Sequence, residues 1–378
     1  MKYYLVAGEA SGDLHGSNLI KTLKEVDSAA DFRYYGGDLM QDQGGILVKH
    51  YAEMAFMGFL EVALNLRTIL KNIKKCKEDI LRYQPNVLIL IDFPGFNLKI
   101  ANFAKEQGIQ VHYYISPKVW AWNQKRVLKI KRDVDFMYCI LPFEVDFYKT
   151  WGLKVDYVGN PLLDAKVAFT PNLNFKTQYN LSNKPIIALL PGSRKQELNY
   201  ILPDMLSVIS SFPNYQFVIA GAPSFNKEYY DKYIKDIAIP IVFNATYDLL
   251  HVAEAALVTS GTATLETALF KVPQVVVYKG GTISIAIARM LVKIKFISLV
   301  NLIMDKEIVK EIIQENLTEQ HLTNALRNIT ENELHRKEVM NNYESLHALL
   351  AAGGGEASAK VAKEIVALAG PKLFIDEG

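Results

Sequence analysis

The chain has 378 residues, of which 50% are hydrophobic and 22% charged, and its formal net charge is +2. This length predicts two or three domains, each able to bury its own core. The charge balance argues against nucleic acid as a partner. The two cysteines, Cys76 and Cys139, form no disulfide framework or metal cluster, which is typical of a reducing compartment. The chain enters its first strand without a secretory signal, so we expect a cytoplasmic protein.

Strands and helices alternate through the first half of the chain. A helix is expected to start near Asp13, and further helices are expected at about 59–83, 97–106, 124–132 and 143–151. The apolar runs between them predict strands at residues 3–7, 32–36, 87–91, 111–115, 136–140 and 155–158. This alternation is typical of a parallel sheet that is covered by helices on both faces.

The same alternation resumes in the second half. Residues 168–184 are polar and aperiodic, which indicates a linker. Strands are then predicted at 186–190, 216–220, 241–243, 256–259 and 274–278, and the chain from about Leu317 is mostly helical. We therefore predict two doubly wound, Rossmann-like α/β domains, residues 1–165 and 166–335, that face a central cleft, with C-terminal helices 336–378 packing back on the rest. Such a cleft suits an enzyme that joins two large substrates.

A single acid, Asp92, follows the apolar run Val87–Ile91, and a Pro-Gly turn and a helix come after it. Ligands bind at the carboxyl ends of the strands of a parallel sheet, so this acid is expected at a binding edge. Its neighbours Phe93 and Phe96 would partly desolvate it and raise its pKa toward that of a general base. The alternative is a turn aspartate that caps the following helix.

Two further loops follow predicted strands in this half. The first, GEASGD at residues 8–13, lacks the third glycine of a dinucleotide fingerprint, which disfavours NAD. It could let a sugar or phosphate approach the backbone, and its candidate contacts are Gly8, Ser11, Gly12 and Asp13. The second, SPKVWAW, begins at Ser116 and places two tryptophans, Trp120 and Trp122, beside Lys118, Lys125 and Arg126. Aromatic faces beside cations bind sugars and phosphates. Core packing of the tryptophans is the alternative.

Two glycine turns in the second half predict a phosphate site. PGSRKQE puts Ser193 and Arg194 at a helix amino terminus, where backbone N–H groups and a guanidinium converge on an anion. A plain turn with a surface arginine is the alternative. SGTATLE repeats the pattern, and its candidate contacts are Ser260, Gly261, Thr262 and Glu266. The glutamate would accept both hydroxyls of a ribose, unless it is a solvated helix-start residue. Together the two turns favour a nucleotide diphosphate.

A metal site is not predicted. Asp133-Val134-Asp135 has the spacing of an acid-x-acid metal motif but precedes its strand, whereas metal ligands are expected at the outlet of a strand. The seven histidines are scattered, and none belongs to a metal or nucleophile motif. We therefore expect neither a metal nor an organic cofactor.

No apolar run reaches the roughly 18 residues that a membrane-spanning helix needs. Residues 52–75 instead combine apolar side chains with a basic border, which suits the surface of an anionic membrane. The candidate interface residues are Met57, Leu60, Leu64, Arg67 and Lys71. An amphipathic core helix with a solvated basic face is the alternative. Residues 282–304 are a second such stretch, with a buried helix that leads into a strand as the alternative.

Five motifs, GEASGD, IDFPGFN, SPKVWAW, LLPGSR and SGTATLE, resemble in sequence, order and separation those of the lipid-A-disaccharide synthase family. The resemblance extends from about Tyr4 to about Gln314. It implies an inverting GT-B glycosyltransferase that transfers 2,3-diacylglucosamine from UDP-2,3-diacylglucosamine to 2,3-diacylglucosamine 1-phosphate. The products would be UDP and the β-1,6-linked disaccharide 1-phosphate of lipid A.

The roles that this resemblance implies agree with the local interpretation. Asp92 matches the acid proposed as base, Arg194 the arginine of the nucleotide half, Glu266 the ribose-side acid, and Asn301 an asparagine near the donor. Because both substrates carry acyl chains, the resemblance favours peripheral association with the inner face of the inner membrane of a Gram-negative bacterium. The sequence leaves a homodimer open.

The chain departs from the family pattern at two positions. Asn160 stands where relatives often have histidine, and Val300 replaces their proline before Asn301. Two rival interpretations also remain. One is another GT-B nucleotide-sugar enzyme, such as a UDP-N-acetylglucosamine epimerase or a murein-pathway transferase. The other is a non-catalytic lipid-surface protein that binds nucleotide, and the ordered motifs in both halves argue against it.

Overall fold

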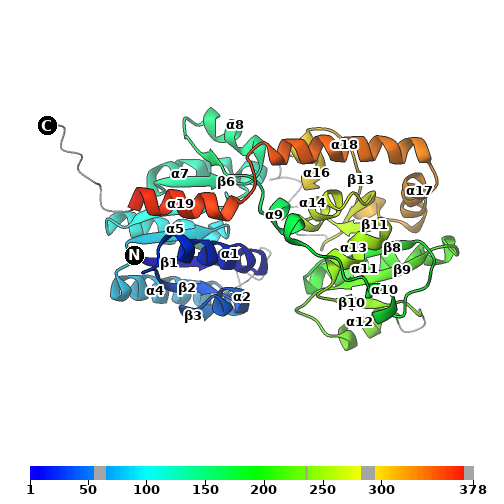
Figure 1. The fold of residues 1–378 in the computed structure, drawn as a ribbon, viewed down its shortest axis with the longest axis horizontal. Coiled ribbons are helices and arrows are strands. Elements are labelled where there is room, and N and C mark those ends of the chain that lie inside the picture. Colours follow the sequence, from blue (N-terminus) through cyan, green and yellow to red (C-terminus); the bar gives the residue numbers. More distant parts are fainter. Residues whose placement is uncertain (55–64, 235–236, 282–293, 370–378) are drawn as a thin grey trace. The chain divides into compact units, whose positions relative to one another are not determined.

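The computed structural model describes residues 1–54, 65–234, 237–281 and 294–369, and the chain divides into two compact α/β units (Figure 1). The first unit contains Met1–Pro161 and Leu350–Gly378, and the second contains Leu162–Leu349. The boundary predicted at 165 lies inside helix α9 (Pro161–Ala168), and the one predicted at 335 lies inside helix α18 (Glu333–Ala351). The C-terminal segment 336–378 is therefore divided between the units near the end of α18.

The first unit is built on a seven-stranded sheet in the order β3-β2-β1-β4-β5-β6-β7. Its strands are β1 (Lys2–Ala7), β2 (Asp31–Gly36), β3 (Ile46–His50), β4 (Val87–Ile91), β5 (Gln110–Tyr114), β6 (Phe136–Cys139) and β7 (Asp156–Tyr157). Its helices are α1 (Ala10–Val26), α2 (Asp38–Asp42), η1 (Tyr51–Glu53), α4 (Leu66–Tyr83), α5 (Pro94–Glu106), α6 (Val119–Trp122), η2 (Gln124–Arg126), α7 (Val127–Asp133), α8 (Pro142–Thr150) and α19 (Ala357–Ala369). Strand β1 pairs in parallel with β2 and β4, so the winding reverses there, and the loops after β1 and β4 form a switch point of the kind that binds ligands.

The second unit repeats this plan with a six-stranded sheet in the order β10-β9-β8-β11-β12-β13. Its strands are β8 (Ile186–Leu190), β9 (Gln216–Gly221), β10 (Ile241–Phe243), β11 (Ala253–Thr259), β12 (Gln274–Tyr278) and β13 (Lys310–Ile313). Besides α18 and α9, which lies in this unit from Leu162 onward, its described helices are α10 (Phe175–Gln178), α11 (Lys195–Ser207), η3 (Ile209–Ser211), α12 (Lys227–Ile234), α13 (Thr246–Val252), α14 (Thr262–Leu269), α16 (Leu299–Met304), η4 (Gln314–Asn316) and α17 (Glu319–Thr330). The winding reverses between the paired strands β8 and β11, which the two predicted phosphate turns follow.

Both faces of the first sheet are covered. In β1, Tyr4 and Val6 join one apolar cluster, whereas Tyr3 and Leu5 join the other, as the two-residue period of a strand requires. Helix α19 packs beside α1 on the Tyr3 face, where it contributes Val361, Ala362 and Ile365 (Figure 1). The end of the chain therefore completes the core of the unit in which the chain begins.

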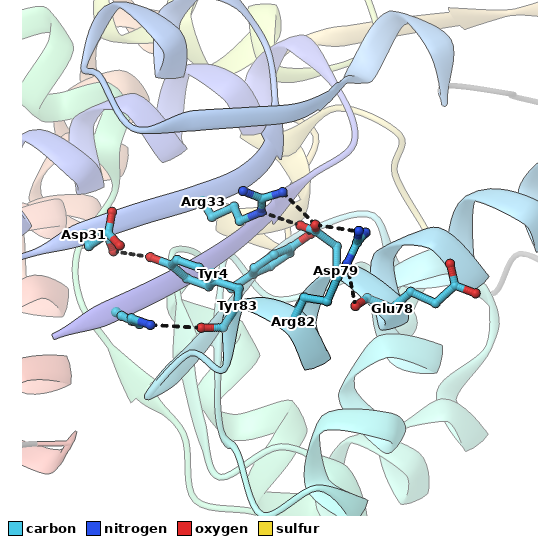
Figure 2. A network of polar contacts seen from close by, with 8 residues as sticks. Tyr4, Asp31, Arg33, Glu78, Asp79, Arg82 and Tyr83 are labelled. Carbon is cyan, nitrogen blue, oxygen red and sulfur yellow. Dashed lines mark hydrogen bonds and ion pairs between the residues drawn. The ribbon is translucent and has the colours of Figure 1, made fainter.

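Near the amino ends of β1 and β2, a buried carboxylate joins three elements (Figure 2). Asp79 of α4 accepts two hydrogen bonds from Arg33, at 2.6 and 2.7 Å, and one from the Tyr4 hydroxyl at 2.9 Å. Arg82 lies 3.6 Å from the same carboxylate. Burial opposes ionisation, but the hydrogen bonds and positive charges lower the pKa of Asp79 below its usual value. This network fastens α4 to β1 and β2.

Several elements differ from the predictions. The edge strands β3 and β13 were not predicted, because most of their residues are only half buried and lack the continuous apolar run of a central strand. The predicted linker contains α10, whose Phe175 is buried in the core of the second unit. The helix predicted at 59–83 is described from Leu66 onward, and residues 55–64 lie outside the described part of the chain.

Candidate active site

Asp92 lies in the loop after β4, at the switch point of the first sheet. Both Asp92 and Phe93 have left-handed backbone conformations, with φ angles of +43° and +49°. The turn is held through its main chain, because the Asp92 carbonyl accepts hydrogen bonds from the Tyr113 hydroxyl at 2.5 Å and from Asn97 Nδ2 at 2.8 Å. Helix α5 begins at Pro94 with Phe93 as its cap residue, so Asp92 is not the cap of this helix.

The Asp92 carboxylate lies in a setting that suits a base. The residue is half buried, and burial raises the pKa of its carboxyl, while Lys118 and the backbone N–H of Phe93 oppose that rise. Among the residues that the structure describes, no side chain donates a hydrogen bond to this carboxylate. A partly desolvated carboxylate whose oxygens are not held by side-chain donors is well suited to take a proton from a hydroxyl.

The GEASGD loop contacts Asp92's turn, but its residues have protein partners. A Cβ atom at Gly8 would lie 2.2 Å from Phe93 Cγ, so the phenyl ring fills the space that a ligand would use there. A Cβ atom at Gly12 would lie 3.2 Å from the Cβ atom of Ala7, so this glycine is also closely packed. The Asp13 carboxylate accepts hydrogen bonds from three backbone N–H groups at the start of α2, those of Gly37, Leu39 and Met40. Ser11 is exposed, and a ligand role for this loop stays a prediction.

The two tryptophans of SPKVWAW lie in different settings. Trp120 is 7% exposed, and its Nε1 donates to Glu144 Oε1 at 3.1 Å. Ser116 is also buried, and its hydroxyl lies 2.8 Å from that of Tyr148. Trp122 is 38% exposed, and the guanidinium of Arg126 lies 4.4 Å from the centre of its ring. The cation over an aromatic face that the sequence suggested is therefore formed at Trp122, whereas Trp120 packs in the core.

In the second unit, the turn after β8 already holds a carboxylate. Glu197 Oε2 accepts hydrogen bonds from the backbone N–H groups of Ser193, at 2.9 Å, and Arg194, at 3.2 Å. Its Oε1 accepts from the Arg194 guanidinium at 2.8 Å. Gly192 has a φ of +98°, and a Cβ atom there would lie 2.3 Å from the Glu197 carboxylate. The turn thus has the anion-binding geometry that the sequence predicted, with a protein carboxylate in the place of a phosphate.

The turn after β11 leads into α14. Gly261 has open space around the position of a Cβ atom, and Thr262 is the first residue of the helix. The Ser260 hydroxyl donates to the Ile297 carbonyl at 2.8 Å. Glu266 accepts a hydrogen bond from the Tyr247 hydroxyl at 2.9 Å, and burial raises the pKa of its carboxyl, which this hydrogen bond opposes. Glu266 is therefore not a solvated helix-start residue.

Asn301 is completely buried, and both ends of its amide are used. Its Oδ1 accepts from the backbone N–H groups of Ile308 and Val309, and its Nδ2 donates to the Val309 carbonyl and to Glu311. Glu311 also accepts from the backbone N–H groups of Ile297 and Ser298. In this structure Asn301 therefore shapes the loops around α16, and contact with a donor stays a prediction.

Three glutamates that the sequence analysis did not select organise these loops. Glu144 and Glu197 each occupy the third position of a helix and accept a hydrogen bond from the backbone N–H that precedes the helix. This is the glutamate half of a capping box, and a glutamate three residues after the cap residue is its local signal. Glu311 lies in edge strand β13, and no local pattern marked it.

The two departures from the family pattern are accommodated by local contacts. Asn160 is buried and donates from Nδ2 to the Ile140 carbonyl at 3.0 Å. Val300 is buried as the second residue of α16, where the cap residue Ser298 accepts from the backbone N–H of Asn301.

The structure describes only part of the segment that is predicted to contact a membrane. Met57, Leu60 and Leu64 lie outside the described residues. In α4, Leu66 and Leu70 are 49% and 48% exposed, and Arg67 and Lys71 are exposed beside them. Of the helices in the described ranges, none is long and apolar enough to cross a membrane. In the same part of the chain, no group of three or more His, Cys, Asp or Glu side chains is arranged to hold a metal ion.

Two doubly wound parallel sheets in one chain, each with polar turns where its winding reverses, define the GT-B architecture of many nucleotide-sugar enzymes. A UDP-GlcNAc 2-epimerase from Neisseria meningitidis, solved with UDP-GlcNAc bound, aligns with a TM-score of 0.67 and 13% identity over 97% of this chain and 100% of that chain. The glycotransferase of kitacinnamycin aligns with a TM-score of 0.64 and 13% identity over 96% of this chain and 98% of that one. These likenesses establish the fold.

Sequence comparison identifies the family. The family model described as lipid-A-disaccharide synthetase matches residues 3–365. The lipid-A-disaccharide synthase of Trichlorobacter lovleyi is 35% identical over 375 residues, which cover 96% of each chain. That of Syntrophus aciditrophicus is 40% identical over 318 residues, which cover 82% of this chain and 83% of the relative. The chain belongs to the lipid-A-disaccharide synthase family and is a glycosyltransferase, so the predicted resemblance is confirmed.

Proposed function

We propose that the chain catalyses the reaction of its family with Asp92 as general base. In this reaction 2,3-diacylglucosamine passes from UDP-2,3-diacylglucosamine to the 6-hydroxyl of 2,3-diacylglucosamine 1-phosphate, and UDP leaves. The observation that carries the proposal is the half-buried Asp92 carboxylate in the loop after β4, at the switch point of the first sheet. The carboxylate takes the proton of the 6-hydroxyl as that oxygen attacks the anomeric carbon from the face opposite UDP, so the configuration inverts.

The second unit binds the UDP part of the donor in this scheme. The turns after β8 and β11 end paired strands, which supports binding of one diphosphate by both. The Arg194 guanidinium and the N–H groups near Ser193 and Thr262 stabilise the charge that grows on the diphosphate as the glycosidic bond breaks, and a metal is not required. The phosphate displaces Glu197 from the first turn, and Glu266 accepts the ribose hydroxyls.

Product analysis tests this proposal directly. The purified chain is incubated with both diacylated substrates and a chelator, and the products are analysed by mass spectrometry. We expect the disaccharide 1-phosphate and UDP in equal amounts, and no product when the donor lacks its acyl chains. Epimerisation of UDP-N-acetylglucosamine, or nucleotide binding without turnover of any UDP-sugar, would contradict the proposal.

Peripheral association with the inner membrane is the second part of the proposal. Leu66 and Leu70 expose apolar surface beside Arg67 and Lys71 at the start of α4, which suits an interface with anionic lipid. Sedimentation with anionic and neutral vesicles tests it, and we expect binding to anionic vesicles that a double Leu66→Ser, Leu70→Ser variant weakens. Leu173→Ser is the matched control, because Leu173 is 96% exposed in the second unit. Equal binding of all three proteins would exclude α4 from the interface.

A further inference from the structure

Helix α8 carries a buried acid that joins two segments of the first unit. Glu144 is 1% exposed. Its Oε1 accepts from Trp120 Nε1 at 3.1 Å, and its Oε2 accepts from the backbone N–H of Leu141 at 3.2 Å. The Ser116 hydroxyl lies 2.8 Å from the hydroxyl of Tyr148, a second α8 residue. Helix α8 therefore holds the segment between Ser116 and Trp120 at both ends.

That segment follows β5, which pairs with β4, so it adjoins the loop of the proposed base, and it carries the cation Lys118. Lys118 is exposed between the two buried anchors, and its positive charge acts both on the Asp92 carboxyl and on the Glu144 carboxyl. Trp120 is fixed further by edge-on packing against Phe143, with ring centres 4.9 Å apart. Release of the Glu144 contacts would therefore let Lys118 move relative to Asp92.

We propose that Glu144 is a positioning residue for glycosyl transfer, which holds Trp120 so that Lys118 keeps its place in the loop next to that of Asp92. The proposal rests on the proposed role of Asp92 as base. Glu144 itself is buried and touches neither substrate in this scheme. Its effect on the reaction is exerted through the SPKVWAW loop.

The ionisation state of Glu144 should affect how firmly it holds the SPKVWAW loop. The titratable groups that act on it are Lys118 in the loop, Cys139 in β6, Tyr148 in its own helix and Tyr157 in β7. Burial raises the pKa of Glu144 to about 7, although the hydrogen bonds from Trp120 and Leu141 and the charge of Lys118 oppose this rise. Trp120 and Leu141 are both N–H donors, which bind a carboxylate more strongly than the neutral acid, so protonation would weaken these two contacts. We therefore expect kcat/KM to decline as the pH falls through about 7.

The pH profiles of two variants test the inference. Glu144→Gln keeps the size of the side chain but cannot titrate, and its amide nitrogen cannot accept from a second donor. We expect kcat to fall about tenfold to a hundredfold, the usual effect of a small displacement at a reacting centre, and the limb near pH 7 to disappear. Trp120→Phe removes one donor to the carboxylate and should shift that limb to higher pH. Profiles that keep the wild-type limb in both variants would overturn the inference, and the second variant decides if the first does not fold.

Two controls separate this inference from its premise. Asp79→Asn changes another buried carboxyl of the same unit. If the role of Glu144 is merely structural, Glu144→Gln should behave like Asp79→Asn: each variant loses stability, and the pH profile of kcat/KM stays unchanged. Asp92→Asn tests the base itself. If Asp92→Asn is inactive and the Glu144 variants are normal, only the positioning role fails. If Asp92→Asn is active, the proposed function fails whatever the Glu144 variants do.

Discussion

Two of the buried carboxylates of the first unit, those of Asp79 and Glu144, lie in opposite electrostatic settings. Near the amino ends of β1 and β2, Asp79 is hydrogen-bonded to Arg33 and Tyr4, and the pKa of its carboxyl is lowered. Beyond the carboxyl end of β6, Glu144 accepts from the neutral donors Trp120 and the backbone N–H of Leu141, and burial raises its pKa to about 7. Two side chains of similarly low exposure therefore differ: the pKa of Asp79 is lowered, whereas that of Glu144 is raised to about 7.

The difference shows that buried acids at the two edges of one sheet have different roles, one in stability and the other in chemistry. A cation in direct contact compensates the cost of burying Asp79, so its network fastens elements together. Glu144 lacks such a contact, and burial raises its pKa to about 7. Burial also raises the pKa of Asp92. Acids with perturbed pKa values cluster at catalytic and binding sites. The carboxyl edge is therefore the end at which substitutions should change activity more than stability.

The largest expected effect is that of Asp92→Asn on turnover. Removal of a positioned base should lower kcat by about 10² to 10⁴. The folded protein should be no less stable, because burial disfavours the charge of Asp92 and the asparagine has none. Steady-state kinetics and thermal unfolding measure the two effects. A variant that loses stability but keeps turnover would place Asp92 with Asp79 in the structural class.

Asp79→Asn should show the reverse pattern. Loss of the buried ion pair should lower the free energy of unfolding by about 3 kcal/mol, at the low end for buried pairs because part of Arg33 reaches solvent. We expect kcat/KM to stay close to the wild-type value. Urea unfolding and kinetic assays check this prediction. Glu78→Gln is the matched control, because Glu78 is its exposed neighbour on α4 and should change neither quantity.

The two acids should also give opposite pH dependences of stability. The folded pKa of Asp79 is lowered, so its stabilisation is present above the unfolded pKa of about 3.9 and is lost as the pH falls below that value. The difference in unfolding free energy between wild type and Asp79→Asn should therefore shrink in acid. Urea unfolding between neutral pH and acid measures this difference. A difference that grows in acid would contradict the assignment.

For Glu144 the sign is reversed. Its folded pKa of about 7 lies above the unfolded value, so its stabilisation is present below the unfolded pKa and is lost as the pH rises through about 7. Between the unfolded pKa of about 4.3 and pH 7, the stability of wild type relative to Glu144→Gln should fall by up to about 3 kcal/mol. Urea unfolding at pH values on both sides of this interval tests the prediction. A constant difference would mean that Glu144 does not titrate there.

The smallest effect sharpens the account of the Asp79 network. Tyr4→Phe removes one hydrogen bond to Asp79 but leaves Arg33 in place, so it should cost about 1 kcal/mol of unfolding free energy. Urea unfolding of this variant and of Asp79→Asn compares the two contributions. A loss as large as that of Asp79→Asn would mean that the tyrosine, and not the ion pair, supports the network.

The central strands and the binding turns could be predicted from the sequence by itself. Strands such as β4 and β8 are buried on both faces and therefore consist of continuous apolar residues. The turns that follow them carry an acid or a glycine, which local patterns identify. The motifs in these turns were also sufficient to predict the family. Edge strands such as β3 were missed because half-buried residues leave no such run.

Only the tertiary structure decided what the polar side chains at these turns contact. Asp13 caps α2, Asn301 is bonded to Ile308 and Val309, and Trp120 meets Glu144. The sequence lists the donors and acceptors but not their pairing, because each buried polar group accepts whichever partner the packed sheet and helices bring within reach. The same packing decides whether a buried acid has a cation as its partner, as Asp79 does, or neutral donors, as Glu144 does.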